Sequence, residues 1–283
     1  MKGRGKNKTR VMDKNPRDQH INVFEMRQMT SIPRMRQIVP GLFLGNVLAT
    51  CTPEMLQTNR TNAILSLCND SWSWWSTRTR EAGIPESRHR WVECHDSATQ
   101  DFLAEMTTIC NFIDRMASPA LAALSALPTE AENDVAAKNT SKKPTTKTAG
   151  RIHWSSRGAL RVRLHHQKQK VEPEAILVHC YAGVSRSPTI IIAYLMRKLK
   201  LPWQDVLKYV RTKQKVWPRE NMQRQLEIWG ALEYQVWEDE SKKVPKPMYK
   251  AYLKDRDLLL KAPCERAQQK LIKELYPECI VWS

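Results

Sequence analysis

The most constraining feature of this chain is the stretch at residues 175–200, AILVHCYAGVSRSPTIIIAYLMRKLK. It opens with a short apolar run that predicts a buried strand, and Pro188 then stands where the first turn of a helix accepts proline. The residues that follow predict a mostly apolar helix. A strand, a tight loop and a helix N-terminus form a natural anion site, because backbone N–H groups point inward and the helix dipole adds partial positive charge.

Two reactive side chains lie inside this loop, Cys180 and Arg186, with five residues between them. Such a pair is common by chance, so its specificity comes from its neighbours His179, Gly183 and Ser187. An ordinary thiol is mostly protonated at neutral pH, but the amides, the helix dipole and Arg186 favour the nucleophilic thiolate. The guanidinium matches two phosphate oxygens, and Gly183 allows a tight backbone turn. We therefore expect attack on phosphorus through a covalent thiophosphate intermediate.

Length and cysteine content favour an intracellular protein with a substantial core. At 283 residues the chain can hold one large domain or two small ones. Its seven cysteines form no CxxC pair and no dense framework, which favours free thiols in a reducing compartment. The charged N-terminus is followed by no apolar run, and no stretch is long enough to span a membrane. We expect a soluble protein of the cytoplasm, the nucleus or both, without membrane insertion.

Basic residues are in large excess and are concentrated in two segments. Lys and Arg total 46 against 29 acidic residues, which gives a net charge of +17. Residues 1–37 hold ten basic and three acidic residues, and residues 138–172 hold ten basic and one acidic residue. Such segments are typical of solvated, disordered chain, of nuclear-targeting patches, or of sites for RNA or acidic partners. All three interpretations stay open, and we expect residues 1–37 to be a mostly disordered arm.

The pattern of the remaining chain predicts an α/β layer fold. Strand character covers residues 38–46, 62–68 and 90–95, and helical spacing covers residues 52–59, 102–116, 202–211 and 221–236. Residues 38–237 form the predicted domain, interrupted at 117–173 by a low-complexity insertion. No periodicity there persists long enough for a packed element, so we expect the insertion to be largely disordered. Residues 238–283 form a charged C-terminal extension with a helical stretch near 247–261.

Two local features admit both a structural and a functional interpretation. Residues 71–76, SWSWWS, hold three tryptophans that either pack on the core or form an aromatic lip over the site or a partner-docking surface. The pair His165 and His166 suggests a metal, but two adjacent histidines without a third ligand are usually solvated. We therefore expect no metal site.

The residues of the central loop resemble the dual-specificity branch of the cysteine-dependent protein phosphatases, whose signature reads HCxAGxSRS. The likeness extends to four segments: VPGLFLGN at 39–46, FID at 112–114, SRSPTIIIAYLM at 185–196, and PRENMQRQL at 218–226, which is similar to the family's closing PNxGFxxQL. It covers about residues 38–237 without the insertion. The resemblance implies the fold of this family, a central mixed, mostly parallel sheet flanked by helices. It also implies the atypical type, which has no N-terminal rhodanese-like domain.

The resemblance implies a role for each site residue and no cofactor. Cys180 would be the nucleophile, Arg186 would bind phosphate and the transition state, His179 would tune the thiolate, and Ser187 would assist its departure. The backbone of Tyr181, Ala182, Gly183, Val184 and Ser185 would bind phosphate together with Arg186. The family also needs a carboxylic acid that protonates the leaving oxygen and later activates water. Asp96 stands at the matching position, and Asp101 is the alternative, although it is closer to the next helix and suits a surface or capping role.

Departures from the family pattern lie in the closing segment and near the acid. Arg219, Asn221 and Met222 stand where Asn, Gly and Phe are usual. Asn221 can still adopt a left-handed conformation, whereas Arg219 either weakens support of the loop or adds positive charge beside it. Cys94, two residues before Asp96, is either a partner for a regulatory disulfide with Cys180 or an inert buried thiol.

Three functions fit this sequence to different degrees. The leading prediction is a protein phosphatase acting on phosphotyrosine and phosphoserine/threonine. The basic composition suggests an RNA 5′-phosphatase as the alternative, although Tyr181, Ala182, Val184 and Ser185 fit protein phosphatases better. The loop contains no lysine, which argues against phosphoinositide substrates. A non-catalytic phosphoprotein-binding module is disfavoured because Cys180, Arg186 and Asp96 are all present.

Overall fold

The computed structural model describes residues 30–69, 79–128, 174–239 and 241–262, together with residues 264 and 267. The tryptophan-rich segment at 71–76 and the pair His165 and His166 lie outside the described residues, as do most of the basic arm and most of the insertion. Within the described ranges no helix is long and apolar enough to cross a membrane.

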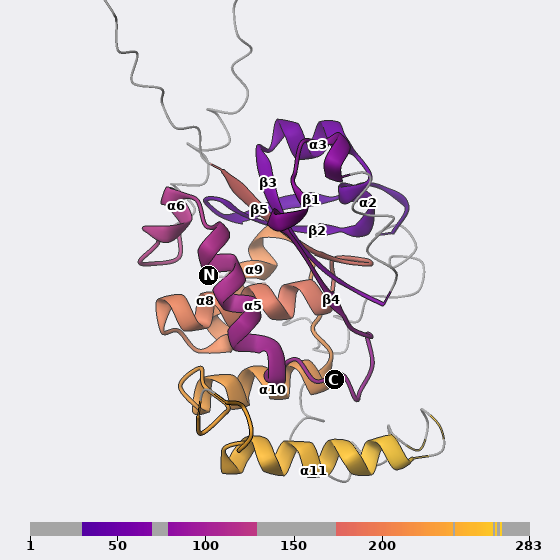
Figure 1. The fold of residues 1–283 in the computed structure, drawn as a ribbon, viewed down its shortest axis with the longest axis vertical. Coiled ribbons are helices and arrows are strands. Elements are labelled where there is room, and N and C mark those ends of the chain that lie inside the picture. The colour runs from indigo at the N-terminus through magenta and orange to yellow at the C-terminus, as the bar shows by residue number, and fades with distance from the viewer. Residues whose placement is uncertain are drawn as a thin grey trace, which may run out of the picture.

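A five-stranded sheet lies at the centre of the molecule (Figure 1). In spatial order its strands are β1 (Met35–Val39), β2 (Leu42–Asn46), β5 (Ala175–Cys180), β3 (Thr61–Cys68) and β4 (His89–Glu93). β1 pairs with β2 in antiparallel orientation, and every other pairing is parallel. The sheet therefore confirms the predicted mixed, mostly parallel arrangement, with β5 as its central strand.

Side chains alternate between the two faces of the sheet along each strand, and a core cluster covers each face. On β5, Ile176 and Val178 join the larger core cluster, whereas Leu177 joins the smaller one on the opposite face. Helices α5 (Leu103–Met116), α8 (Arg186–Leu199), α9 (Trp203–Lys213) and α10 (Glu220–Ala231) lie on the side of the larger cluster, and α2 (Val47–Thr50) and α3 (Pro53–Thr58) lie on the other (Figure 1).

Among the described helices, α8 is the most deeply buried, as its apolar sequence predicts. All residues from Arg186 to Met196 are buried, so the helix that begins at the signature sequence is enclosed by its neighbours. It ends where Lys200 adopts a left-handed conformation with φ of 57°. The loop before this helix is therefore joined at one end to a fully packed element.

Three predicted boundaries are wrong. The sheet begins at Met35, inside the segment assigned to the arm, because β1 pairs with β2 from that residue. Helix α10 ends at Ala231 and does not continue to residue 236, because Glu233 and Tyr234 take positive φ angles that no α-helix accommodates. Apolar spacing persisted to Val236, which is buried although it lies beyond the helix.

The third correction concerns the start of the insertion. A short helix, α6 (Pro119–Ala122), lies just after residue 117, and its Leu121 is fully buried in the larger core cluster. Ser118 caps this helix, since its hydroxyl accepts a hydrogen bond from the N–H of Leu121 at 3.2 Å. One turn with one buried leucine is too short to show periodicity, which is why the sequence pattern missed it.

The C-terminal extension contributes a helix, α11 (Pro247–Lys261), at the predicted position. It packs through Tyr249, Tyr252 and Leu259, which are all buried. In Figure 1 it lies beside α10, at the end of the molecule away from the sheet. The extension is therefore partly integrated into the core.

Candidate active site

The loop at residues 181–185, here called the signature loop, connects the carboxyl end of β5 to the start of α8. Its turn depends on Gly183, which has φ of +72°. A Cβ atom at this position would lie 2.7 Å from the carbonyl oxygen of Gly45 on β2, closer than real Cβ contacts allow. Gly183 is therefore required for both its conformation and its close contact with β2.

Cys180 is the last residue of β5 and is almost fully buried, with 2% of its surface exposed. Its Sγ accepts two hydrogen bonds, from the N–H of Gly183 at 3.3 Å and from the hydroxyl of Ser187 at 3.2 Å. Donors directed at a sulfur stabilise its anionic form. The structure thus brings Cys180, Gly183 and Ser187 together as the sequence predicts.

Arg186 is the first residue of α8 and is also buried. One terminal nitrogen of its guanidinium donates to the carbonyl oxygen of Cys94 at 3.1 Å. Its buried Nε has no acceptor among the described residues. The N-cap residue Ser185 makes no side-chain capping bond to the helix. Donors at this helix start are thus left for an anion.

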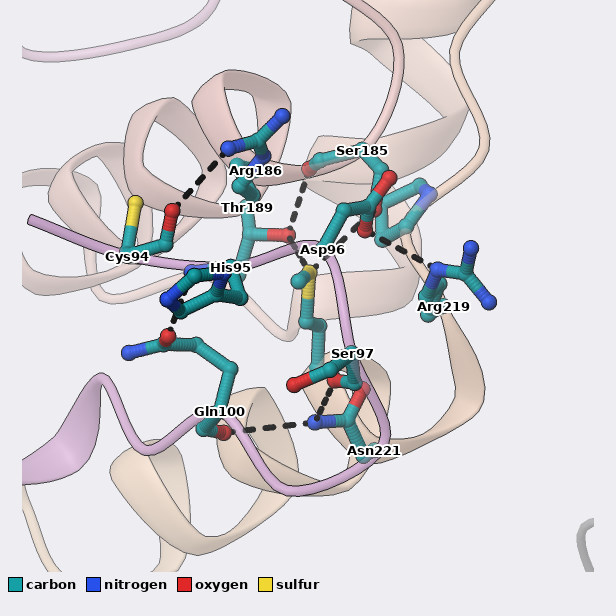
Figure 2. A network of polar contacts seen from close by, with 12 residues as sticks. Cys94, His95, Asp96, Ser97, Gln100, Ser185, Arg186, Thr189, Arg219 and Asn221 are labelled. Carbon is teal, nitrogen blue, oxygen red and sulfur yellow. Dashed lines mark hydrogen bonds and ion pairs between the residues drawn. The ribbon is translucent and has the colours of Figure 1, made fainter. Parts of the chain in front are cut away.

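Asp96 follows β4 and lies beside Ser185 of the signature loop (Figure 2). Its Oδ1 accepts a hydrogen bond from the hydroxyl of Ser185 at 2.9 Å and another from Nε of Arg219 at 3.0 Å. The same Ser185 hydroxyl lies 3.3 Å from the sulfur of Met222. A carboxylate, a thiol and a guanidinium therefore meet around one loop, although 83 residues of sequence lie between Asp96 and Cys180.

Asp101 does not reach this loop. Its Oδ1 accepts hydrogen bonds from the N–H groups of Leu103 at 2.9 Å and Ala104 at 3.4 Å, which caps the start of α5. Its Oδ2 accepts a hydrogen bond from the hydroxyl of Tyr249 at 2.8 Å. Burial raises the pKa of the Asp101 carboxyl, and the bond from Tyr249 opposes that shift. The two aspartates therefore have separate environments.

Comparisons with known proteins identify the family of this chain. The family model described as dual specificity phosphatase, catalytic domain, matches residues 164–231. Dual specificity protein phosphatase 22-A of Danio rerio is 30% identical over 207 residues, which cover 72% of this chain and 70% of that protein. This chain belongs to the dual-specificity phosphatase family. The enzyme class predicted from the sequence, a protein phosphatase, is thereby confirmed.

One further relative matches a shorter part of the chain, and one solved structure has a lower sequence identity. A probable dual specificity protein phosphatase of Dictyostelium discoideum is 52% identical over 62 residues, so the match spans only 21% of this chain and 26% of that relative. The crystal structure of DUSP15 superposes with a TM-score of 0.45 at 19% identity, over 71% of this chain and 90% of that structure.

In this dual-specificity phosphatase, His179 lies fully buried beneath the signature loop. Its Nε2 is 2.6 Å from the hydroxyl of Ser66 on β3, and that hydroxyl is 2.8 Å from Nε2 of His89 on β4. Because a hydroxyl has one hydrogen, it donates to one ring and accepts from the other. Burial lowers the pKa of His179 to about 3 and that of His89 to about 4. Both rings are therefore neutral at physiological pH and add no positive charge near Cys180.

The thiol of Cys94 has the environment of an inert group. It is buried, and this burial raises its pKa to about 12, although the charge of Arg186 opposes the shift. Cys94 and Cys180 are both free cysteines. Cys94 contributes to the site through its backbone, because its carbonyl oxygen accepts the hydrogen bond from Arg186. In the part of the chain that the structure describes, no three His, Cys, Asp or Glu side chains converge as metal ligands would.

Several supporting residues were not predicted from the sequence. Gln214, the residue that follows α9, donates from Nε2 to the carbonyl of Gly183 at 2.9 Å and so holds the signature loop. Asn221 lies in the first turn of α10 and not in a left-handed conformation, and its amide donates to the carbonyls of Ser97 at 3.0 Å and Gln100 at 3.2 Å (Figure 2). Gln214 follows the predicted helix at 202–211, and Asn221 begins the predicted helix at 221–236. A polar residue at a helix end is a weak signal, and it does not identify a partner.

Proposed function

We propose that this chain hydrolyses phosphotyrosine and phosphoserine/threonine in proteins through a cysteinyl-phosphate intermediate. One observation carries the proposal: the Sγ of Cys180 accepts hydrogen bonds from Gly183 and Ser187 at the start of α8, while the signature loop is also bonded to Asp96. A nucleophile, an anion site and an acid thus lie next to the same loop. Family membership supports the same reaction.

In the first step the Cys180 thiolate attacks phosphorus, and the bond from phosphorus to the ester oxygen breaks. The guanidinium of Arg186 and the signature-loop amides bind the phosphoryl oxygens, where charge develops in the transition state. Asp96 gives its proton to the leaving oxygen. Ser185 and Arg219 both donate hydrogen bonds to Oδ1 of Asp96, and Oδ2 makes no hydrogen bond to the described residues. We therefore assign the proton transfer to Oδ2.

In the second step water attacks the phosphocysteine. The Asp96 carboxylate, left ionised by the first step, takes the proton of that water. The bond between phosphorus and sulfur breaks, and inorganic phosphate leaves. The hydroxyl of Ser187, 3.2 Å from Sγ, stabilises the thiolate that departs. Cys180 and Asp96 thereby return to their initial protonation states.

Arg219 gives this site a feature that the family pattern lacks. Its ion pair with Asp96 holds the carboxylate toward the signature loop and restricts the movement of that side chain. The Arg219 side chain is 56% exposed, so the ion pair is worth at most about 1 kcal/mol. Such a weak restraint orients the acid without locking it.

The basic segments support a second, separate proposal about partners. The charge of +17 and the concentration of basic residues at 1–37 and 138–172 suit binding of RNA or of an acidic partner. We propose a cytoplasmic or nuclear location on the basis of the same segments and of the cysteine pattern. Nothing in the signature loop favours RNA as the substrate.

A direct test measures hydrolysis of an aryl phosphate, of phosphopeptides and of 5′-triphosphorylated RNA by the purified chain. We expect turnover of phosphotyrosine and phosphothreonine peptides, and loss of turnover with retained peptide binding in Cys180→Ser. Unchanged turnover in that variant would exclude the mechanism. Faster release of phosphate from RNA than from any phosphopeptide would replace the proposed substrate class.

A further inference from the structure

The loop at residues 96–101, which holds Asp96, is bound by the C-terminal helix α11. Three side chains of α11 donate to it: the hydroxyl of Tyr249 to Oδ2 of Asp101 at 2.8 Å, the hydroxyl of Tyr252 to the carbonyl of Gln100 at 3.2 Å, and Nε of Arg256 to the carbonyl of Thr99 at 2.7 Å. They are spaced at three and four residues and so share one face of the helix.

The 96–101 loop needs these partners because it belongs to no helix or strand. Its carbonyls have no ladder to satisfy them, and unpaired buried polar groups are costly. From the other side α10 supplies Asn221 and Gln225; the Gln225 amide donates to the carbonyl of Gln100 at 2.8 Å and accepts from the N–H of Phe102 at 2.6 Å. Figure 2 shows the Asn221 bonds closing the loop below Asp96.

Helix α11 is packed against the rest of the domain, so its contacts can hold the 96–101 loop in place. Tyr249 is buried, and its ring meets that of Trp237 edge to face at a centroid distance of 5.3 Å. Asp255 forms a half-buried ion pair with Arg224 of α10 at 3.1 Å. The helix therefore connects the loop to the same core that holds the signature loop.

We propose that α11 positions the general acid, with Tyr249 and Arg256 as the positioning residues. This inference rests on the proposed function of Asp96. Ser185 and Arg219 both donate to the same oxygen of Asp96, and the Asp96 side chain is 32% exposed. These two bonds leave the position of the carboxyl dependent on the backbone of the 96–101 loop as well. A misplacement of about 1 Å can reduce a reaction rate by about 100-fold. Loosening α11 should thus impair proton transfer selectively.

The test compares substrates that differ in their need for the acid. Phenyl phosphate and an alkyl phosphate have basic leaving groups that require a proton, whereas a fluorinated aryl phosphate has a leaving group that does not. We expect Tyr249→Phe and Arg256→Ala to lower kcat on the first two by about tenfold and on the fluorinated substrate by less than about twofold. Tyr209→Phe, which removes a hydroxyl bonded to the carbonyl of Ile38, and Lys254→Ala, on the exposed side of α11, are the matched controls.

A second comparison separates positioning from general destabilisation. In an Asp96→Ala background the acid is absent, so adding Arg256→Ala should leave kcat unchanged on every substrate. Equal losses on all substrates, or a further loss in the Asp96→Ala background, would overturn the inference. Arg256 is not part of the core, so its variant provides this result even if Tyr249→Phe unfolds. A wild-type chain inactive on all three substrates would instead refute the proposed function.

Discussion

At the scale of single residues, the site depends on two aspartates that the sequence places five positions apart. Asp96 contacts Ser185 of the signature loop, whereas Asp101 caps α5 and binds Tyr249. Their roles therefore differ in kind: one is placed to transfer a proton, and the other stabilises the structure that holds it. Substitutions should separate these effects.

We predict that Asp96→Ala lowers kcat on phenyl phosphate by about 10²- to 10⁴-fold, because that is the usual contribution of a general acid. Asp101→Ala removes the acceptor of Tyr249, so it should lower kcat on phenyl phosphate by only about tenfold. It should also lower the free energy of unfolding by about 0.5–2 kcal/mol through loss of the helix cap. Steady-state kinetics and urea unfolding of both variants measure the two quantities. A larger kinetic loss in Asp101→Ala would move the acid to that residue.

A second prediction at this scale concerns Gly183, with Gly83 as the matched control. Gly183 and Gly83 both have positive φ, but a Cβ at Gly183 would clash with the Gly45 carbonyl, whereas a Cβ at Gly83 would meet no atom within 4 Å. Gly83→Ala should cost only about 1–2 kcal/mol of backbone strain and keep full activity. Gly183→Ala should cost more and abolish turnover of aryl phosphates. Equal behaviour of the two variants would contradict the close contact with β2.

At the scale of elements, the adjacent strands β4, β3 and β5 are linked by the buried chain His89, Ser66 and His179. Both imidazoles have lowered pKa values in the folded protein, about 4 and about 3, against about 6.5 in an unfolded chain. Below pH 6.5 the unfolded state therefore binds more protons than the folded state. Stability is present above that pH and is lost as the pH falls toward 3.

We predict that the free energy of unfolding falls with decreasing pH between about 6.5 and 4, and that His89→Gln removes about 1.4 kcal/mol per pH unit from that slope. Urea unfolding at pH 7, 6 and 5 measures it. Asp101, whose raised pKa acts in the opposite direction, contributes equally to both proteins. An unchanged slope in His89→Gln would show that His89 is protonated in the folded state.

The element scale also shows what sequence patterns could and could not predict. The strand, loop and helix around Cys180 were predictable because their signals are local: apolar runs, a proline at a helix start and a glycine in a turn. Ser66, His89 and Gln214 could not be recognised, because their significance comes only from strand order and helix packing. The C-terminal end of α10 and the single turn of α6 were also missed. Val236 is buried although it lies beyond a helix, and Leu121 is buried in a helix too short to show periodicity.

At the scale of the whole molecule, the net charge of +17 has no role in the proposed catalytic mechanism. The substitution of glutamine for the ten basic residues at 138–172 keeps the chain length while removing that charge. If the segment binds RNA, affinity for single-stranded RNA should fall, and the slope of log K against log salt should become shallower. Electrophoretic mobility shifts over a salt series measure both, with turnover of aryl phosphate as the control that should not change. Equal affinity of the two proteins would leave the charge as a property of solvated chain.

The strand order has a consequence for how the molecule could be divided. β5 lies between β2 and β3, although it follows them in sequence after residues 129–173. A chain cut within that segment would yield two fragments, one with four strands and a gap at the centre and one with the missing strand, the nucleophile and α8. Neither fragment could form the sheet alone, and only their mixture would regain activity. Complementation of the two fragments would therefore report assembly of the active site.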